Sequence, residues 1–361
     1  MKICVIRFVK LIKYIAEIFR SLAYNQLMTT RENVFDALSR SDGAAVSGEK
    51  LAEICGVSRA AIWKAVKSLR EEGFIIEGTT NGGYVYKGES DILTAERLKA
   101  FLVSSYPNLV SASVECFKTI DSTLTHAKRL LADGDMLKLD NHIIVAESQT
   151  QGRGRLGRTF CSPEKTGIYL TVIHIPKEHN ADPAKITAFA AVAVCRVIQR
   201  LYNVEPKIKW INDIYLNDKK IVGILTEGFI NFETSAIDAA SIGIGINITG
   251  GSSQFPEDVA KVAGSILQDG ESAVSRSQLA AEVAGEVLSI FGENPKAVMH
   301  EYQSLSFLTG QTVKVHPVID SAAGVYEAKV IGIDDDARLL VQLQDGTTKA
   351  LLSGEVSLHQ D

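Results

Sequence analysis

The sequence of 361 residues lacks the marks of a secreted, membrane-spanning or disulfide-stapled protein. Its cysteines (Cys4, Cys55, Cys116, Cys161 and Cys195) are scattered, and no two of them stand at CxxC or metal-ligand spacing. They therefore predict reduced thiols in a cytoplasmic protein rather than a disulfide framework. No apolar run reaches the roughly 18–20 residues that a membrane-spanning helix needs, so no membrane partner is expected.

The start of the chain also lacks a clear signal peptide, because charged residues interrupt its apolar stretch and no small-residue cleavage site stands out. Lys10, Lys13, Glu17 and Arg20 recur at helical spacing, which is compatible with an amphipathic helix lying on a surface. The domain pattern begins only after Met28. We therefore interpret residues 1–28 as an upstream extension.

Long-period repeats and low-complexity tracts are absent, and a formal net charge of −5 provides no general basic surface. Binding to DNA would thus require a local cluster of Lys and Arg. The length suits two or three domains. We expect a DNA-binding domain at residues 29–90, a linker with one helix at 91–110, a catalytic domain at 111–305 and a small domain at 306–361.

The first domain has the element order of a winged helix-turn-helix. Helical spacing predicts helices at 30–39, 47–54 and 58–72, with a tight turn at 55–57, and two short strands follow at 74–77 and 84–86 around a glycine-containing turn. The third helix would present to DNA the side chains of Ser58, Arg59, Lys64 and Lys67. A protein-interaction module is the alternative. Trp63 is interpreted as a packing residue, with exposure for contact as the alternative.

The rest of the chain predicts an α+β protein with a mixed α/β centre. Apolar runs predict strands at 143–146, 168–175, 208–210, 221–225 and 237–248. Helical spacing predicts helices at 94–103, 121–132, 183–201 and 277–291. Short alternating segments after residue 311, separated by turns with Asp and Gly, predict a small separate β-barrel.

The most informative segment is QTQGRGRLGR at residues 149–158, which we call the arginine loop. Three arginines alternate with three glycines directly after a predicted strand. Arginine offers permanently charged, two-pronged donors that suit carboxylate and phosphate, and glycine lets backbone approach a ligand closely. The segment fits neither a Walker loop nor a dinucleotide fingerprint. An RG-rich nucleic-acid loop is the alternative, but such loops usually lie in disordered tails. We interpret it as a mobile loop that closes over a phosphorylated ligand.

Three further segments carry polar residues beside predicted strands. KIKWIND at 207–213, followed by KKIVGILTE at 219–227, combines lysine, amide and carboxylate groups, and oxygen ligands of this kind suit Mg²⁺. IGIGIN at 242–247 places glycines on one face of a strand, which often marks close approach of a ligand or of backbone. TIDST at 119–123 heads a helix, where its hydroxyls either cap the helix or bind a ligand.

Together these segments, in this order, resemble the biotin protein ligase family over residues 117–357. The winged helix adds its bifunctional class, which also represses biotin genes. The resemblance implies a biotin/lipoate-ligase-like catalytic domain, an SH3-like C-terminal barrel, and closing strand residues at 353–358. It implies an enzyme that uses ATP and Mg²⁺ to convert biotin to biotinyl-5′-AMP and transfers it to a lysine of the biotin carboxyl carrier protein of acetyl-CoA carboxylase. It also implies a homodimer, formed in the adenylate-bound state, that binds operator DNA.

The resemblance carries over to individual residues. The expected catalytic residues are Lys209, Arg153 and Arg155. The expected biotin-binding residues are Ser122, Thr123, Gln149, Gly152, Arg153, Arg155 and Lys209. The expected ATP- and adenylate-binding residues are Arg158, Asn212, Asp213, Gly243, Gly245 and Asn247, with Asp213 as a ligand of Mg²⁺.

The sequence departs from the family pattern at three positions. Leu124 stands where the family often has asparagine, Ile211 where it usually has proline, and Phe160 where it often has tryptophan. The first two changes affect details of ligand packing rather than the reaction, and the third is a mild change. Two other functions stay open: a lipoate or octanoate transferase, and a ligand-sensing winged-helix transcription factor without ligase activity.

Overall fold

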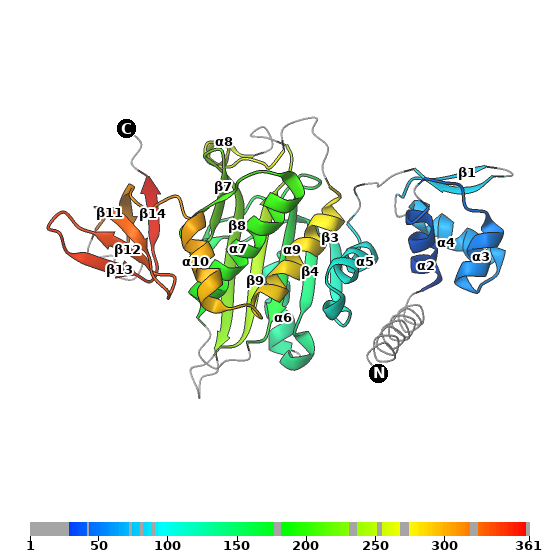
Figure 1. Cartoon of the computed structure of the whole chain (residues 1–361), viewed down its shortest axis with the longest axis horizontal. Coiled ribbons are helices and arrows are strands. Elements are labelled where there is room, and N and C mark those ends of the chain that lie inside the picture. The colour runs from blue at the N-terminus through cyan, green and yellow to red at the C-terminus, as the bar shows by residue number, and fades with distance from the viewer. Residues whose placement is uncertain are drawn as a thin grey trace, which may run out of the picture. The chain divides into compact units, whose positions relative to one another are not determined.

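The structure is a computed structural model that describes residues 29–358, apart from 42, 72–73, 80–81, 88–90, 92, 134, 177–181, 231–236, 251–254, 268–273 and 318–323. The extension and amphipathic helix expected at residues 1–28 lie outside the described residues. The chain divides into two compact units, Met1–Ile92 and Leu93–Asp361 (Figure 1). Among the described helices, none combines the length and apolar content that crossing a lipid bilayer demands.

The first unit has the predicted helices and strands. They are α2 (Thr30–Ser39), α3 (Gly48–Cys55), α4 (Arg59–Glu71), β1 (Ile76–Thr79) and β2 (Gly83–Tyr86). The Ser47 hydroxyl caps α3 by accepting from the backbone N–H of Lys50, and Ser58 does the same for Ala61 at the start of α4. Gly56 ends α3 with a φ of 64°, a conformation that glycine adopts without a steric penalty.

The three helices enclose one small core. Val34, Leu38, Leu51, Ile62 and Leu69 are buried in it. β1 and β2 form an antiparallel ribbon, in which Glu77 lies opposite Val85. The hydrophobic stripe of α4 thus faces inward, and its opposite side faces solvent. This is the expected winged helix-turn-helix.

The second unit is built on a seven-stranded sheet with the order β3-β4-β5-β9-β8-β7-β6. Its strands are β3 (Val114–Ile120), β4 (His142–Gln149), β5 (Gly167–His174), β6 (Lys207–Lys209), β7 (Asp213–Leu216), β8 (Lys219–Ile230) and β9 (Ile237–Asn247). β3 and β4 are parallel, and every other neighbouring pair is antiparallel. The helices are α5 (Ala95–Ser105), α6 (Thr123–Asp133), α7 (Pro183–Tyr202), α8 (Glu257–Ala260), α9 (Arg276–Ile290) and α10 (Pro295–Leu305).

The two faces of this sheet have different partners. Ile143 and Val145 of β4 belong to a large core with α7 and α9, which lie across the near face of the sheet in Figure 1. Ile144 between them packs instead with Ala127 and Leu131 of α6. Because successive side chains of a strand point to opposite faces, α6 covers the other side. The candidate site lies on the α6 side.

The C-terminal strands are β10 (Thr312–His316), β11 (Tyr326–Ile333), β12 (Leu339–Gln342), β13 (Thr348–Leu351) and β14 (Glu355–Leu358). They form an antiparallel sheet with the order β13-β12-β11-β10-β14. No ladder joins the two four-residue edge strands among the described residues, so this sheet is open and not the closed barrel that the sequence predicted. Its buried Val313, Val330 and Val341 belong to the same core as α7 and α9, which explains why it forms one unit with the catalytic domain.

Most predicted elements are confirmed within two or three residues, including Pro183 at the first position of α7. The main differences are elements that the sequence analysis did not predict, namely β3, β7 and α10. β3 is an edge strand without a fully buried residue, and β7 is only four residues long. Neither therefore has a strong apolar pattern.

Candidate active site

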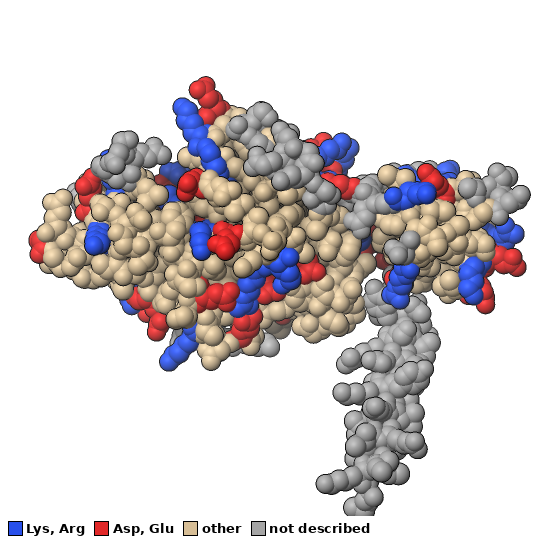
Figure 2. All heavy atoms as spheres, turned by 45° about the horizontal axis from the view of Figure 1, so that its top comes forward, with Lys and Arg blue, Asp and Glu red and all other residues tan. Residues whose placement is uncertain are grey.

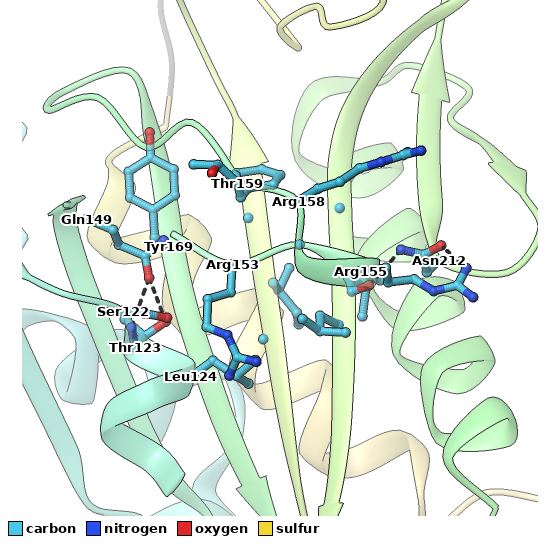
Figure 3. A pocket seen from close by; sticks show the side chains of 18 of the residues that line it. Ser122, Thr123, Leu124, Gln149, Arg153, Arg155, Arg158, Thr159, Tyr169 and Asn212 are labelled. Atoms are coloured by element: carbon cyan, nitrogen blue, oxygen red, sulfur yellow. Dashed lines mark hydrogen bonds between the residues drawn. The ribbon is translucent and has the colours of Figure 1, made fainter. Parts of the chain in front are cut away.

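A pocket lies on the α6 side of the sheet, beside the end of β4 and over the interior of β8 and β9 (Figure 3). Its lining comes from segments that are far apart in the chain: the start of α6, the arginine loop, the 212–225 hairpin, β9 and the start of β14. The lining residues that the sequence predicted are Ser122, Thr123, Gln149, Arg153, Arg155, Arg158, Asn212, Asp213, Gly243 and Gly245. Gly152, Lys209 and Asn247 were also predicted but are not among them.

One end of the pocket is a chain of neutral hydrogen bonds. The side-chain oxygen Oε1 of Gln149 accepts from the Thr123 backbone N–H at 2.9 Å and from its hydroxyl at 3.2 Å. Nε2 of Gln149 donates to the Ser162 hydroxyl at 2.9 Å, and the Thr171 hydroxyl donates to that of Thr123 at 2.9 Å. Figure 3 shows Gln149 and Thr123 pointing toward each other. This network fixes the orientation of the Gln149 amide and ties the arginine loop to α6.

The arginine loop is folded into a short hairpin. The Gly154 N–H donates to the Arg158 carbonyl at 2.8 Å, and the Phe160 N–H donates to the Gly152 carbonyl at 2.9 Å. A β-carbon on Gly152 would lie 2.3 Å from the Phe160 carbonyl oxygen, so this position requires glycine. Leu156 stands at the tip with a φ of 54°.

Each of the three loop arginines contacts a different part of the second unit. Arg153 forms an ion pair at 3.1 Å with Glu227 of β8, which also pairs with Lys128 of α6. Arg155 donates to the Asn212 side-chain oxygen at 3.1 Å, as the dashed line in Figure 3 shows. Arg158 forms an ion pair with Glu355 of β14, in the C-terminal sheet. The guanidinium groups therefore spread along the pocket.

A lysine–aspartate pair lies beside Arg155. Lys220 Nζ is 2.6 Å from Asp213 Oδ1, and both residues line the pocket. Lys209 lies opposite Asp213 in the β6–β7 ladder, and its ammonium lies 5.8 Å from the Tyr215 ring centroid. Burial lowers the pKa of Lys209 below its ordinary value, and the nearby Lys220 charge adds to this effect. Lys220 is thus the lysine at the pocket surface.

The strand glycines leave room for Phe160. A β-carbon on Gly245 would lie 2.3 Å from the Phe160 ring, and one on Gly223, its neighbour on β8, would lie 2.9 Å from the same ring. A β-carbon on Gly243 would meet the Leu124 side chain at 3.1 Å. The glycines predicted to approach a nucleotide therefore lie under two apolar side chains of the protein itself.

The donor atoms of the pocket limit which metal ion it can hold. Within the part of the chain that the structure describes, no group of three His, Cys, Asp or Glu side chains is placed to hold an ion. The pocket offers the carboxylates of Asp213 and Glu355. One or two carboxylates suit Mg²⁺, which takes most of its ligands from water and substrate phosphates, and do not suit an ion that needs a full protein cage.

The predicted DNA-contacting residues all lie in the first unit. Ser58, Arg59, Lys64 and Lys67 are exposed, on or just before α4. Acidic and basic side chains are intermingled on the face shown in Figure 2.

Three family models match the chain. The biotin/lipoate A/B protein ligase family model matches residues 116–247, an HTH domain model matches 30–85, and the biotin protein ligase C-terminal domain model matches 310–359. The curated protein "Bifunctional ligase/repressor BirA" of Salmonella typhimurium is 30% identical over 88% of this chain and 95% of its own length. The chain belongs to the biotin protein ligase family, in its bifunctional ligase/repressor class.

Other comparisons agree with this membership. The protein of the same name from Escherichia coli is 30% identical over 88% of this chain and 94% of its own. The solved structure of a biotin protein ligase from Aquifex aeolicus in complex with biotin and ATP superimposes with a TM-score of 0.55 at 25% identity, covering 69% of this chain and 99% of that one. The fold class, the ligase domain and the helix-turn-helix that the sequence predicted are therefore confirmed.

Sequence reasoning missed three charged residues of this biotin protein ligase site. Lys220 was part of a recognised segment, but the role of a substrate-facing lysine was given to Lys209. Glu227 ends the same segment, and alternation along β8 would have placed it on the face of Gly223. Glu355 had no usable signal, because its position beside the arginine loop depends on how the C-terminal sheet packs.

Proposed function

We propose that this chain activates biotin with ATP to form biotinyl-5′-AMP and transfers the biotinyl group to a lysine of a biotin carboxyl carrier protein. The proposal rests on one observation about the pocket. Neutral side chains held in a hydrogen-bond network line one end of it, and arginine and lysine side chains line the rest. The family membership supports the same reaction. The names of the relatives fit it, as do the biotin and ATP bound in the Aquifex aeolicus structure.

The first step converts an unreactive carboxylate into an acyl donor. A carboxylate oxygen of biotin attacks the α-phosphorus of ATP, and pyrophosphate leaves as the mixed anhydride forms. Negative charge gathers on the transferring phosphate during this step. Arg153, Arg155, Arg158 and Lys220 line the pocket and supply positive charge for it.

The neutral end of the pocket suits the ring system of biotin. The uncharged ureido group needs both donors and acceptors, and Ser122, Thr123 and Gln149 supply both. Leu124 and Phe160 provide apolar surface beside them. A ligand held at this end would direct its carboxylate toward the arginines.

We assign the lysine that meets the biotin carboxylate and the α-phosphate to Lys220, because it lines the pocket. Lys209, which the resemblance selected for this role, does not line the pocket, but its charge interacts with Asp213, Lys220, Glu355 and Arg158, which do. Asn212 accepts from Arg155 and donates to the Ile224 carbonyl at 2.8 Å, so its amide orients that arginine.

Asp213 is the residue we propose to hold Mg²⁺ together with the phosphates of ATP. The ion would neutralise phosphate charge. Lys220 is paired with this carboxylate in the structure and would be available to the substrate if the carboxylate held the ion. Gly243, Gly245 and Asn247 stay candidates for nucleotide contacts, the glycines through their backbone and Asn247 through its side chain, which alternation along β9 places on the same face of the sheet.

The second step is attack of a carrier lysine amine on the acyl carbon, with AMP as leaving group. The mixed anhydride would also react with water. The arginine loop, held at several points, covers the pocket and limits that loss.

The first unit serves the repressor function in this proposal. Ser58, Arg59, Lys64 and Lys67 contact operator DNA, and the adenylate-bound protein dimerises so that two α4 helices meet a two-part operator. The chain acts in the cytoplasm, where carrier protein and DNA are both present.

One experiment tests the enzymatic half. The full chain is incubated with ATP, Mg²⁺, biotin and a carrier domain, and the mass of the carrier is measured. One added biotinyl group that depends on ATP and Mg²⁺ supports the proposal. Transfer of lipoate or octanoate instead would establish the alternative transferase, and no transfer by a folded, biotin-binding chain would establish a sensor.

A further inference from the structure

α4 carries a large aromatic side chain on its solvent side. Trp63 is 56% exposed, whereas its neighbour Ile62 is fully buried. The expectation that Trp63 packs in the core is therefore wrong. Single exposed apolar residues are common on protein surfaces, so the role of Trp63 depends on the side chains around it.

Positive charges flank the indole along the same side of the helix. Arg59, Trp63 and Lys67 are spaced by four residues, so they form one stripe along α4. Lys67 Nζ lies 5.7 Å from the centroid of the indole ring. Lys64 is exposed next to Trp63. The apolar surface of Trp63 thus lies within a cationic stripe.

A cationic stripe with an apolar centre is complementary to the major groove of duplex DNA. The phosphates of both strands border the groove and attract Arg and Lys, but these contacts carry no sequence information. The groove floor has one apolar feature, the C5-methyl group of thymine, and apolar side chains recognise it. The indole N–H can also donate to a base acceptor.

We propose that Trp63 is a sequence-reading residue, which packs against a thymine methyl group in the major groove while Arg59 and Lys67 bind the phosphates beside it. This inference rests on the DNA-binding half of the proposed function and adds to it the base type that is read. Lys64 and Lys67 set affinity for any duplex, and Trp63 sets the preference among duplexes.

The experiment uses the full chain with ATP, Mg²⁺ and biotin. A preferred duplex is selected from a random-sequence library with the wild-type protein. Binding of this duplex and of a scrambled duplex of equal composition is then measured by fluorescence anisotropy at several salt concentrations. The variants are Trp63→Ala, Trp63→Phe and Lys67→Ala, with Ile75→Ala as the control at an equally exposed apolar residue of the same unit.

We expect Trp63→Ala to lose about 5- to 100-fold of its affinity for the selected duplex and little for the scrambled one, with an unchanged salt slope. Lys67→Ala should weaken binding of both duplexes and reduce the salt slope. Replacing thymines one at a time by deoxyuracil removes single methyl groups. At the contacted position, loss of the methyl group should weaken DNA binding by the wild type and leave DNA binding by Trp63→Ala unchanged. Trp63→Phe should show part of the wild-type loss.

Intrinsic fluorescence gives a second readout, because the chain has two tryptophans and Trp210 is buried. The selected duplex should reduce acrylamide quenching of Trp63. Equal duplex preference in Trp63→Ala and wild type would overturn the inference while DNA binding stands. Loss of dimerisation in Trp63→Ala without DNA would assign the indole to a protein contact instead. If the wild type binds no duplex, the DNA-binding half of the proposed function fails as well.

Discussion

Arg158 of the arginine loop and Glu355 of β14 form an ion pair with 2.6 Å between Nη2 and Oε2, although 197 positions separate them in the chain. Beside this pair, Arg155 Nη2 donates to the Gly354 carbonyl at 3.4 Å. Trp210 Nε1, behind the pocket, donates to the Ala337 carbonyl at 2.8 Å. The C-terminal sheet therefore holds both the loop that carries the arginines and the strand end that carries Asn212.

Replacing Glu355 by Gln keeps the side-chain shape and removes the charge that holds Arg158. Because Arg158 is largely exposed, we expect a modest effect, up to about fivefold more free biotinyl-AMP released in the absence of carrier. Chromatography of the reaction mixture measures it. The control is Glu327→Gln, at an exposed glutamate of the same sheet. Equal release by both variants would show that Glu355 does not hold the loop.

Replacing Arg155 by Gly removes the contacts to Asn212 and Gly354 together. Hydrogen bonds of charged groups contribute about 1.5–3 kcal/mol each, so release of the adenylate should rise more than tenfold. Arg155→Lys keeps the charge but not the two-pronged geometry and should give an intermediate value. A free adenylate pool no larger than that of the wild type would show that the loop is not a lid.

The two lysines near Asp213 can be separated by parallel alanine substitutions. Lys220→Ala should reduce the rate of biotinyl-AMP formation about 100-fold or more, because it removes a charge at the pocket surface. Lys209→Ala should reduce it less. Single-turnover adenylation, with thermal unfolding as a check on folding, compares the two. A larger loss in Lys209→Ala would return the substrate-facing role to Lys209.

The Gly245→Ala change tests the packing of the Phe160 ring against the strand glycines. Its methyl group would overlap the Phe160 ring, so we expect a loss of about 1–3 kcal/mol in the free energy of unfolding and a weaker affinity for biotin. Adding Phe160→Ala should restore most of the stability. Gly243→Ala, whose methyl group would meet the flexible end of Leu124 at 3.1 Å and the Leu225 carbonyl oxygen at 3.4 Å, is the matched control. A double variant as unstable as Gly245→Ala would place the strain elsewhere.

The pH dependence of stability should report Asp121, next to Ser122. The Arg129 guanidinium, 2.7 Å away, lowers the pKa of Asp121 from 3.8 to about 2. Since the folded state holds this proton less tightly than the unfolded state, the pair stabilises the fold fully above the unfolded pKa, and the effect is lost as the pH falls from about 4 to about 2. Urea midpoints of wild type and Asp121→Asn should therefore differ at pH 6 and converge at low pH. A constant difference would contradict the assignment.

The sequence predicted the elements best where one physical signal dominated. Helix α7 has Pro183 at its start and an apolar stripe through its whole length, and its bounds were nearly right. Asn294 and Pro295 gave a comparable start signal for α10, in which Asn294 accepts from two backbone N–H groups. The helix was nevertheless missed, although Val298, Met299 and Tyr302 follow at helical spacing and are buried. The edge strand β3 alternates too little to be recognised.

The site was predictable as a set of segments but not as a set of contacts. Ten of the residues expected from the motifs line one pocket. The sequence did not predict that the strand glycines make room for Phe160. The Phe160 ring reaches Gly223 and Gly245 only because the arginine loop folds into a hairpin. Alternation along β8 was a usable signal for Glu227, but the place of Glu355 depends on tertiary packing, for which a single sequence has no local signal.

The pocket includes residues from Ser122 through Glu355, so its parts leave the ribosome at very different times. At about 5–20 residues per second, more than ten seconds separate synthesis of its first and last members. A nascent chain can fold its DNA-binding unit early, but its arginine loop has no anchor on β14 until almost all of the chain has emerged. Unfinished chains are therefore expected to have a folded DNA-binding unit before they can retain a reactive adenylate.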